Sequence, residues 1–135
     1  MRATDDRRCF VCGSENPEGM RLEFRTEAAG EASAELAVPD RYAGWSGVVH
    51  GGIVCTLLDE AMAKAAMAAG HPVATVELSV RYLAPVPTGA TCRVVGKVLE
   101  VRRRLVLTEG SVSDAEGRVF ATATAKMLVV ARGET

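Results

Sequence analysis

Residues 48–62, VVHGGIVCTLLDEAM, contain the start of the segment that decides the fold. From Ile53 to Ala69 the chain has neither proline nor glycine and is rich in Ala, Leu and Met, which favour helix. Gly70 and Pro72 are typical of a helix end. Apolar residues occupy almost the whole circumference of this helix, which predicts that it is buried inside a domain. Other elements must therefore wrap around it.

The residues on both sides of the helix alternate as strands do. Upstream, MRLEFRT and EASAELAV, separated by Ala29-Gly30, predict a hairpin. Downstream, TVELSVRYL is predicted to place Val76, Leu78, Val80 and Tyr82 on one face. Four strands are expected after the helix, at residues 74–84, 90–101, 104–114 and 118–130. The sequence predicts an α+β domain in which a curved antiparallel sheet is folded around one central helix.

The composition indicates one domain that acts on a small molecule. A chain of 135 residues with 48% hydrophobic content suits a single domain, since domains of roughly 100 to 150 residues are the commonest. We expect residues 1–19 to form an irregular N-terminal arm and residues 20–132 to form the domain. The net charge of −1 predicts no nucleic-acid or membrane partner.

The N-terminus and the cysteines favour a cytoplasmic protein. The first ten residues, MRATDDRRCF, lack the apolar core of a signal peptide. Four cysteines are too few and too scattered for the disulfide framework of a secreted domain, so reduced thiols are expected.

One carboxylate on the helix stands apart from the other polar residues. Thr56, Glu60 and Lys64 recur every four residues and form a polar stripe, which a solvated face would explain. Asp59 lies about 100° around the helix from Glu60. A buried aspartate is costly unless it is paired or has a function. Periodicity alone leaves two readings open: Asp59 is catalytic, or it is merely the edge of a broad stripe.

The start of the helix supplies a second candidate feature. At His50-Gly51-Gly52, free backbone N–H groups and the positive end of the helix dipole could stabilise a developing oxyanion, although a plain glycine-rich helix start is the more common case. Nine residues separate His50 from Asp59, about 13 Å along a helix. If both residues serve one reaction, Asp59 of one subunit must face the Gly51 region of another, so a two-fold dimer is required.

These residues carry a resemblance to a known family. VVHGGIVCTLLDEAM, followed by TVELSVRYLAPVPTG at 75–89, resembles the hotdog-fold acyl-CoA thioesterases of the phenylacetate-pathway (PaaI-like) type, within the 4-hydroxybenzoyl-CoA thioesterase-like superfamily. The resemblance covers roughly residues 20 to 130. It implies a sheet wrapped around one helix, edge-to-edge dimers with two active sites at the subunit interface, and hydrolysis of an acyl-CoA without a cofactor. A tetramer, as a dimer of dimers, is the larger alternative.

The resemblance also implies roles for individual residues. Asp59 would be the base or the nucleophile, Gly51 the oxyanion donor, and His50 a group that orients the thioester carbonyl. Thr75 would position water. Gly52, beside the oxyanion donor, is expected to contact substrate.

Further substrate contacts are expected outside the helix. The cluster Arg102, Arg103 and Arg104 matches a place where family members carry basic residues that touch CoA phosphates, which guanidinium groups suit; a solvated turn is the alternative. Arg81 is a weaker candidate. Several relatives have an asparagine about six residues before the histidine, where this chain has Gly44, so Trp45 is expected to shape the acyl pocket instead.

Cys9 and Cys12 form a CxxC pair in the arm. Such a pair is typical of half a zinc site or of a redox centre, but no second CxxC and no nearby histidine completes four ligands. We therefore expect structural thiols and no metal, with a zinc ion shared between subunits as the alternative.

The main competing function is a binding module. The same fold can hold acyl-CoA as a sensor without turning it over, and release of free CoA would distinguish the enzyme from the sensor. A hotdog dehydratase or hydratase lacks its expected aspartate–histidine pairing here. The sequence leaves the acyl group open.

Overall fold

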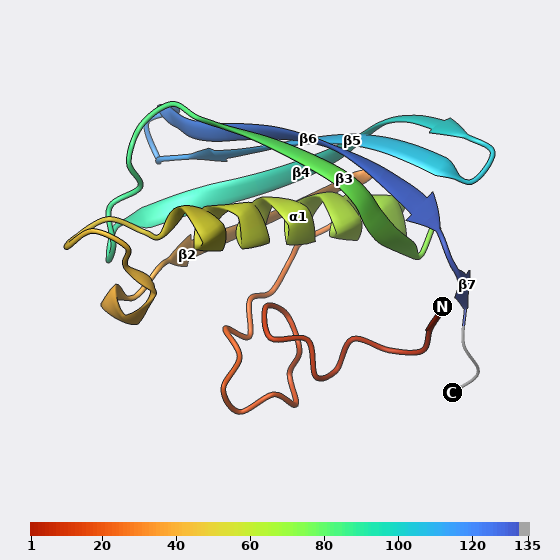
Figure 1. Ribbon diagram of the computed structural model, residues 1–135, viewed down its shortest axis with the longest axis horizontal. Coiled ribbons are helices and arrows are strands. Elements are labelled where there is room, and N and C mark those ends of the chain that lie inside the picture. The colour runs from red at the N-terminus through yellow and green to blue at the C-terminus, as the bar shows by residue number, and fades with distance from the viewer. Residues whose placement is uncertain (133–135) are drawn as a thin grey trace.

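A single long helix lies in the concave face of a five-stranded antiparallel sheet (Figure 1). The computed structural model describes residues 1–132. The helix is α1 (Gly51–Ala68), and the strand order in the sheet is β2-β4-β5-β6-β3. The strands are β2 (Glu31–Ala37), β3 (Val73–Tyr82), β4 (Thr91–Arg102), β5 (Leu105–Ser113) and β6 (Val119–Val129). This is the fold class that the sequence predicts.

Helix α1 is buried because it packs directly on the sheet. Its buried side chains include Leu57, Leu58 and Met62, which are at most 1% exposed. At Gly96 of β4 the two layers nearly touch, since a Cβ built there would lie 2.2 Å from the carbonyl oxygen of Ala61. Only glycine allows such an approach of sheet and helix. This contact sets the distance between the sheet and the helix turn that carries both Ala61 and Asp59.

The four strands after the helix agree with the sequence prediction, but the upstream hairpin does not. Residues 20–26 form no strand, and within them Arg25 alone pairs with Ser33, by hydrogen bonds of 2.7 and 2.9 Å. Arg21 has a positive φ of 52°, which interrupts an extended strand. Met20 and Leu22 instead pack against the hydrophobic core. Their alternation reflects this packing and not a place in the sheet.

A β-bulge interrupts β3 at Val76. In the pairing with β6, Thr75 lies opposite Met127 and Glu77 lies opposite Lys126, so Val76 is the extra residue. Val76 is 65% exposed, whereas Leu78 and Val80 pack against the core. The predicted shared face of these residues is therefore wrong at Val76. The bulge gives Thr75 the face that strict alternation would assign to Val76.

The N-terminal segment crosses the side of α1 that the sheet leaves uncovered (Figure 1). Residues 4–19 contain no strand, but β1 (Arg2–Ala3) pairs in parallel with β7 (Ala131–Arg132). Val11 is 1% exposed and belongs to the core. The segment is therefore part of the packed structure. Within residues 1–132 no helix combines the length and the apolar character needed to cross a membrane.

Candidate functional site

A pocket opens at the N-terminal end of α1. Its volume is about 880 Å³, and it lies between the loop before the helix, the first helical turn and the end of β3. Apolar side chains supply much of its wall. The lining residues are Gly44, Trp45, Val48, Val49, His50, Gly51, Val54, Tyr82, Leu83, Ala84, Pro85 and Val86.

His50 caps the helix with its own side chain. Its Nδ1 accepts a hydrogen bond from the amide of Gly52 at 2.9 Å. A ring nitrogen that accepts in this way carries no proton, so a neutral His50 has its proton on Nε2. His50 is exposed at the pocket, which makes Nε2–H available as a donor to a ligand.

The amide of Gly51 is the free donor at this helix end. No atom of residues 1–132 accepts a hydrogen bond from it, whereas the Gly52 amide is used by His50. Helix N-termini leave such amides unpaired and carry the positive end of the dipole. The amide of Gly51, which the family resemblance implies as the oxyanion donor, is therefore unpaired within the described part of the chain, whereas the amide of Gly52 is bound by His50.

Tyr82 is a pocket residue that sequence reasoning did not assign to the site. Its hydroxyl donates to the carbonyl oxygen of Gly51 at 2.7 Å and lies 2.9 Å from Cys55 Sγ. Burial, followed by the hydrogen bond to Cys55, raises the pKa of Tyr82 to about 12. The tyrosine thus holds the peptide group between Gly51 and Gly52. An aromatic residue with a hydroxyl at the end of an alternating strand was the available signal.

Asp59 lies on α1 about two turns beyond the start of the helix, facing the edge strand β3. The hydroxyl of Thr75 donates to Asp59 Oδ1 at 2.6 Å, and the Asp59 side chain is half-buried. Glu60 faces the N-terminal segment instead, where it contacts Cys9. Asp59 is thus separate from the stripe of Glu60 and Lys64, as its angle around the helix predicts.

Asp59 and the helix start belong to two places on one protomer. Asp59 is not among the residues that line the pocket. Eight residues of helix separate Gly51 from Asp59, which corresponds to about 12 Å. Strand β3, which carries Thr75, is an edge strand of the sheet. One protomer therefore presents a supported carboxylate at its sheet edge and a donor-lined pocket at its helix end.

Comparison with known proteins assigns this arrangement to a family. The family model for the thioesterase superfamily matches residues 46–121, more than half of the chain. The chain belongs to the thioesterase superfamily. The expected enzyme class, a thioester hydrolase of hotdog fold, is thereby confirmed. The matched range contains His50, Gly51, Asp59, Thr75 and Tyr82.

Individual proteins similar to this thioesterase superfamily member are also named as thioesterases. Human acyl-coenzyme A thioesterase 13 is 27% identical over 104 residues, which cover 75% of this chain and 74% of the human protein. A crystal structure of a thioesterase superfamily protein is 28% identical with a TM-score of 0.84. That match covers 91% of this chain, which spans 60% of the length of that protein.

Two further crystal structures share the fold of this thioesterase superfamily member. The smu.793 protein of Streptococcus mutans, bound to acetyl CoA, is 22% identical with a TM-score of 0.77, and the match covers 84% of this chain and 91% of that one. The Escherichia coli PaaI protein from the phenylacetic acid degradation operon is 18% identical with a TM-score of 0.77, and the match covers 84% and 83% of the two chains.

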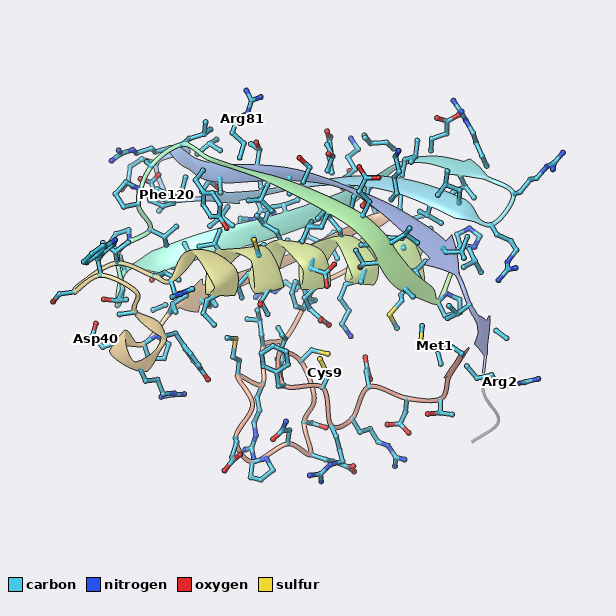
Figure 2. The ribbon with its side chains drawn as sticks, viewed as in Figure 1. Met1, Arg2, Cys9, Asp40, Arg81 and Phe120 are labelled. Carbon is cyan, nitrogen blue, oxygen red and sulfur yellow. The ribbon has the colours of Figure 1, made fainter. Side chains whose placement is uncertain are left out.

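The remaining predicted substrate contacts of this thioesterase superfamily member lie at different places. Trp45 is 84% exposed and lines the pocket. Arg81 lies on the sheet face away from the helix (Figure 2), in a shallow hollow with Lys97 and Glu109. It is not part of the pocket.

The arginine cluster is at the turn between β4 and β5. Arg102 pairs with Glu100 at 2.6 Å, and Arg104 donates to the carbonyl oxygen of Val129 at 3.0 Å. Arg103, at a positive φ of 54°, forms the turn. Because Val129 is paired with Val73, this turn lies at the end of the sheet where β3 begins, away from the pocket of the same protomer.

A second group of polar side chains lies where the N-terminal segment meets α1, and its members on the N-terminal segment lie outside the matched range. Cys9, Cys12 and Glu60 approach one another there, and Lys64 forms a 2.7 Å ion pair with Asp6. Burial, followed by the nearby Glu60, raises the pKa of Cys12 to about 12. The thiol of Cys12 is therefore protonated at neutral pH and is not a ready nucleophile.

Proposed function

We propose that this protein hydrolyses acyl-CoA thioesters, with each active site built from Asp59 of one protomer and the helix start of a second. The observation that carries the proposal is the geometry of the helix. Gly51, whose amide is unpaired among the described residues, lines the pocket at one end of the helix. The half-buried Asp59 is held by Thr75 at the sheet edge, about 12 Å further along the helix and too far away to act in the same pocket. A two-fold pairing of β3 edges would bring each carboxylate to the partner's pocket.

The helix start suits a thioester carbonyl. Negative charge develops on the carbonyl oxygen when the thioester is attacked, and a fixed N–H donor stabilises that charge. The Gly51 amide would supply the main donor, and His50 Nε2–H would supply a second. Tyr82, by binding the Gly51 carbonyl, holds the next peptide group, between Gly51 and Gly52, and so restrains the first turn of the helix.

Asp59 would drive the attack. Its Oδ1 accepts the Thr75 hydroxyl, which orients the carboxylate and leaves Oδ2 for the reaction. As a general base, Asp59 takes a proton from water as the water oxygen bonds to the acyl carbon, and the C–S bond then breaks to release CoA. As a nucleophile, Asp59 would bond to the acyl carbon and expel the CoA thiolate, and water would then hydrolyse the resulting acyl anhydride to the free acid and the regenerated carboxylate. Both routes need the same placement of the carboxylate.

Two observations support CoA esters as the substrate class. Apolar residues such as Val49, Val54 and Val86 line the pocket, which suits an acyl group. The turn with arginines 102–104 lies at the opposite end of β3 from the pocket, so in the proposed two-fold pairing the partner's copy of this turn would come near the pocket and offer guanidinium groups to CoA phosphates. The human relative is named for acyl-CoA thioesterase activity, and the Streptococcus mutans neighbour was crystallised with acetyl CoA.

The direct test is release of free CoA, followed by chromatography, from short, long, branched and aromatic acyl-CoAs. Asp59→Asn should bind the same esters and hydrolyse them at least about a hundredfold more slowly than wild type, since a positioned acid–base group contributes about 10² to 10⁴. Glu35→Gln, at an exposed carboxylate of β2, is the matched control. Equal rates for Asp59→Asn and wild type would refute the mechanism. Tight binding by wild type without CoA release would instead identify a sensor.

A further inference from the structure

The CxxC pair and a helix carboxylate converge on one point beneath α1. The ligand atoms of Cys9, Cys12 and Glu60 all lie within 4.8 Å of one another, and Cys9 Sγ is 3.7 Å from Glu60 Oε2. The three side chains are all partly buried. Figure 2 shows Cys9 on the N-terminal segment where it passes below the helix. The sequence offered only the two cysteines, because Glu60 is 48 residues further along the chain.

The backbone around the cysteines forms a tight turn. The Gly13 amide donates to the carbonyl oxygen of Cys9 at 2.8 Å, and the Glu15 amide donates to that of Arg7 at 2.9 Å. A Cβ at residue 13 would lie 2.5 Å from the backbone of Arg7 and Cys9, so the turn requires glycine. The turn fixes both thiols on the side that faces the helix, where Glu60 lies.

We propose that Cys9, Cys12 and Glu60 bind a zinc ion that fastens the N-terminal segment to α1. Two thiolates and a carboxylate are ordinary zinc ligands, and two cysteines separated by two residues are a recurrent half-site. With Zn–S of about 2.3 Å and Zn–O of about 2.1 Å, sulfur and oxygen ligands of a tetrahedral site lie about 3.6 Å apart. The 3.7 Å between Cys9 Sγ and Glu60 Oε2 already matches this edge.

The surrounding charges suit a divalent cation. Both thiols lose their protons when the metal binds, so the three ligands together carry three negative charges. Zinc neutralises two of them. Lys64, one helical turn after Glu60, lies beside the cluster and is held there by its 2.7 Å bond to Asp6. A water molecule would complete four ligands.

The site is separate from the proposed catalytic site. Glu60 follows Asp59 in the sequence, but Glu60 faces the N-terminal segment whereas Asp59 faces β3. The two cysteines do not line the pocket. The zinc would therefore stabilise the fold and the helix turn that carries Asp59, without contacting substrate. Because metal binding is measured without substrate, its failure and the failure of the thioesterase proposal are distinguishable.

The test is zinc binding by the full chain, reduced and stripped of metal, in competition with a chromophoric chelator. We expect one zinc per chain, a higher melting temperature with zinc, and thiolate-to-metal charge transfer when Co²⁺ replaces Zn²⁺. Cys9→Ser and Cys12→Ser should each weaken binding by at least about a hundredfold, because a ligand is lost. Glu60→Gln should weaken it by at least about tenfold while the protein stays folded by circular dichroism.

Matched controls remove the same groups elsewhere. Cys92→Ala, at a buried thiol of β4, and Glu77→Gln, at an exposed carboxylate of β3, should bind zinc as wild type does. Absence of micromolar binding by the reduced protein would overturn the proposal. So would binding that survives both cysteine substitutions, or an affinity that Glu60→Gln leaves unchanged.

Discussion

The hydroxyl of Thr75 donates a 2.6 Å hydrogen bond to Oδ1 of Asp59, joining the edge strand to the central helix. This bond exists because the bulge at Val76 turns Thr75 toward the helix. It orients the one helix carboxylate that stands apart from the polar stripe. The bond is therefore the structural support of the proposed catalytic group.

Removal of the Thr75 hydroxyl should lower kcat more than it changes KM. A hydrogen bond to a charged group contributes about 1.5–3 kcal/mol, so Thr75→Val should reduce kcat by roughly ten- to a hundredfold. Thr75→Ser keeps the hydroxyl and is expected to retain most of the activity. Steady-state kinetics on the best acyl-CoA of the panel measure both values. Wild-type kcat in Thr75→Val would show that the hydrogen bond to Asp59 does not support the reaction.

Sharing of the active site between protomers can be tested with mixed dimers. Asp59→Asn and His50→Ala homodimers should both be impaired. A heterodimer with one substitution in each protomer has one site with wild-type Asp59 and wild-type His50, if the two residues come from different chains. Such a heterodimer, purified with two affinity tags, should recover about half of the wild-type rate per dimer. If each site lies within one chain, no activity would return.

Tyr82 should ionise later than an ordinary tyrosine. Its pKa is raised to about 12, first by burial and then by the hydrogen bond to Cys55. A raised pKa means that the protonated phenol stabilises the fold. This contribution is complete below the unfolded pKa of about 10 and is lost as pH rises through about 12.

Ultraviolet titration of tyrosinate should therefore show a late component that disappears in Tyr82→Phe. Tyr42, the other tyrosine of the chain, provides the reference signal. The same variant loses the bond to the Gly51 carbonyl, which should lower stability by about 1 kcal/mol. If no tyrosine of the wild-type protein titrated above the usual pKa of about 10, the burial and hydrogen bonding of Tyr82 would be contradicted.

Gly96→Ala should strain the contact between sheet and helix. The added Cβ would meet the Ala61 carbonyl at 2.2 Å, and backbone atoms on both sides must shift. Overpacking of this kind costs about 1–3 kcal/mol. Chemical denaturation measures the loss, and activity should fall with it because the same helix turn region carries Asp59. Lys97→Ala, at the exposed neighbouring residue, should change stability by less than about 0.5 kcal/mol.

Local patterns predicted most of the secondary structure and the candidate carboxylate. The apolar circumference of 53–69 and the flanking glycines predicted a buried helix, which the structure has as Gly51–Ala68. Alternation and turn residues predicted β3 to β6. The angle between Asp59 and Glu60 separated the two carboxylates before any contact was known. Each of these inferences depends on residues near in sequence, where backbone geometry sets the period.

Reasoning from local patterns failed where contacts with segments distant in sequence determine the environment of a residue. Residues 20–26 alternate like a strand, but Met20 and Leu22 pack against the core and Arg21 interrupts the extended chain. Tyr82 was expected only to share a strand face with Leu78 and Val80, whereas its hydroxyl binds the start of the helix 31 residues earlier. In both cases the environment of the residue depends on which element of the fold packs against it.

The sequence by itself therefore determined the buried helix and the strands after it, because local periodicity encodes them. The residues proposed for thioester chemistry came from the resemblance of their motif to a known family. Only the tertiary structure placed Thr75 on Asp59, since the bulge at Val76 is a property of the register between β3 and β6. It also brought Glu60 to Cys9 and Cys12 across the chain. Register and long-range packing are set by the whole fold, and no local pattern records them.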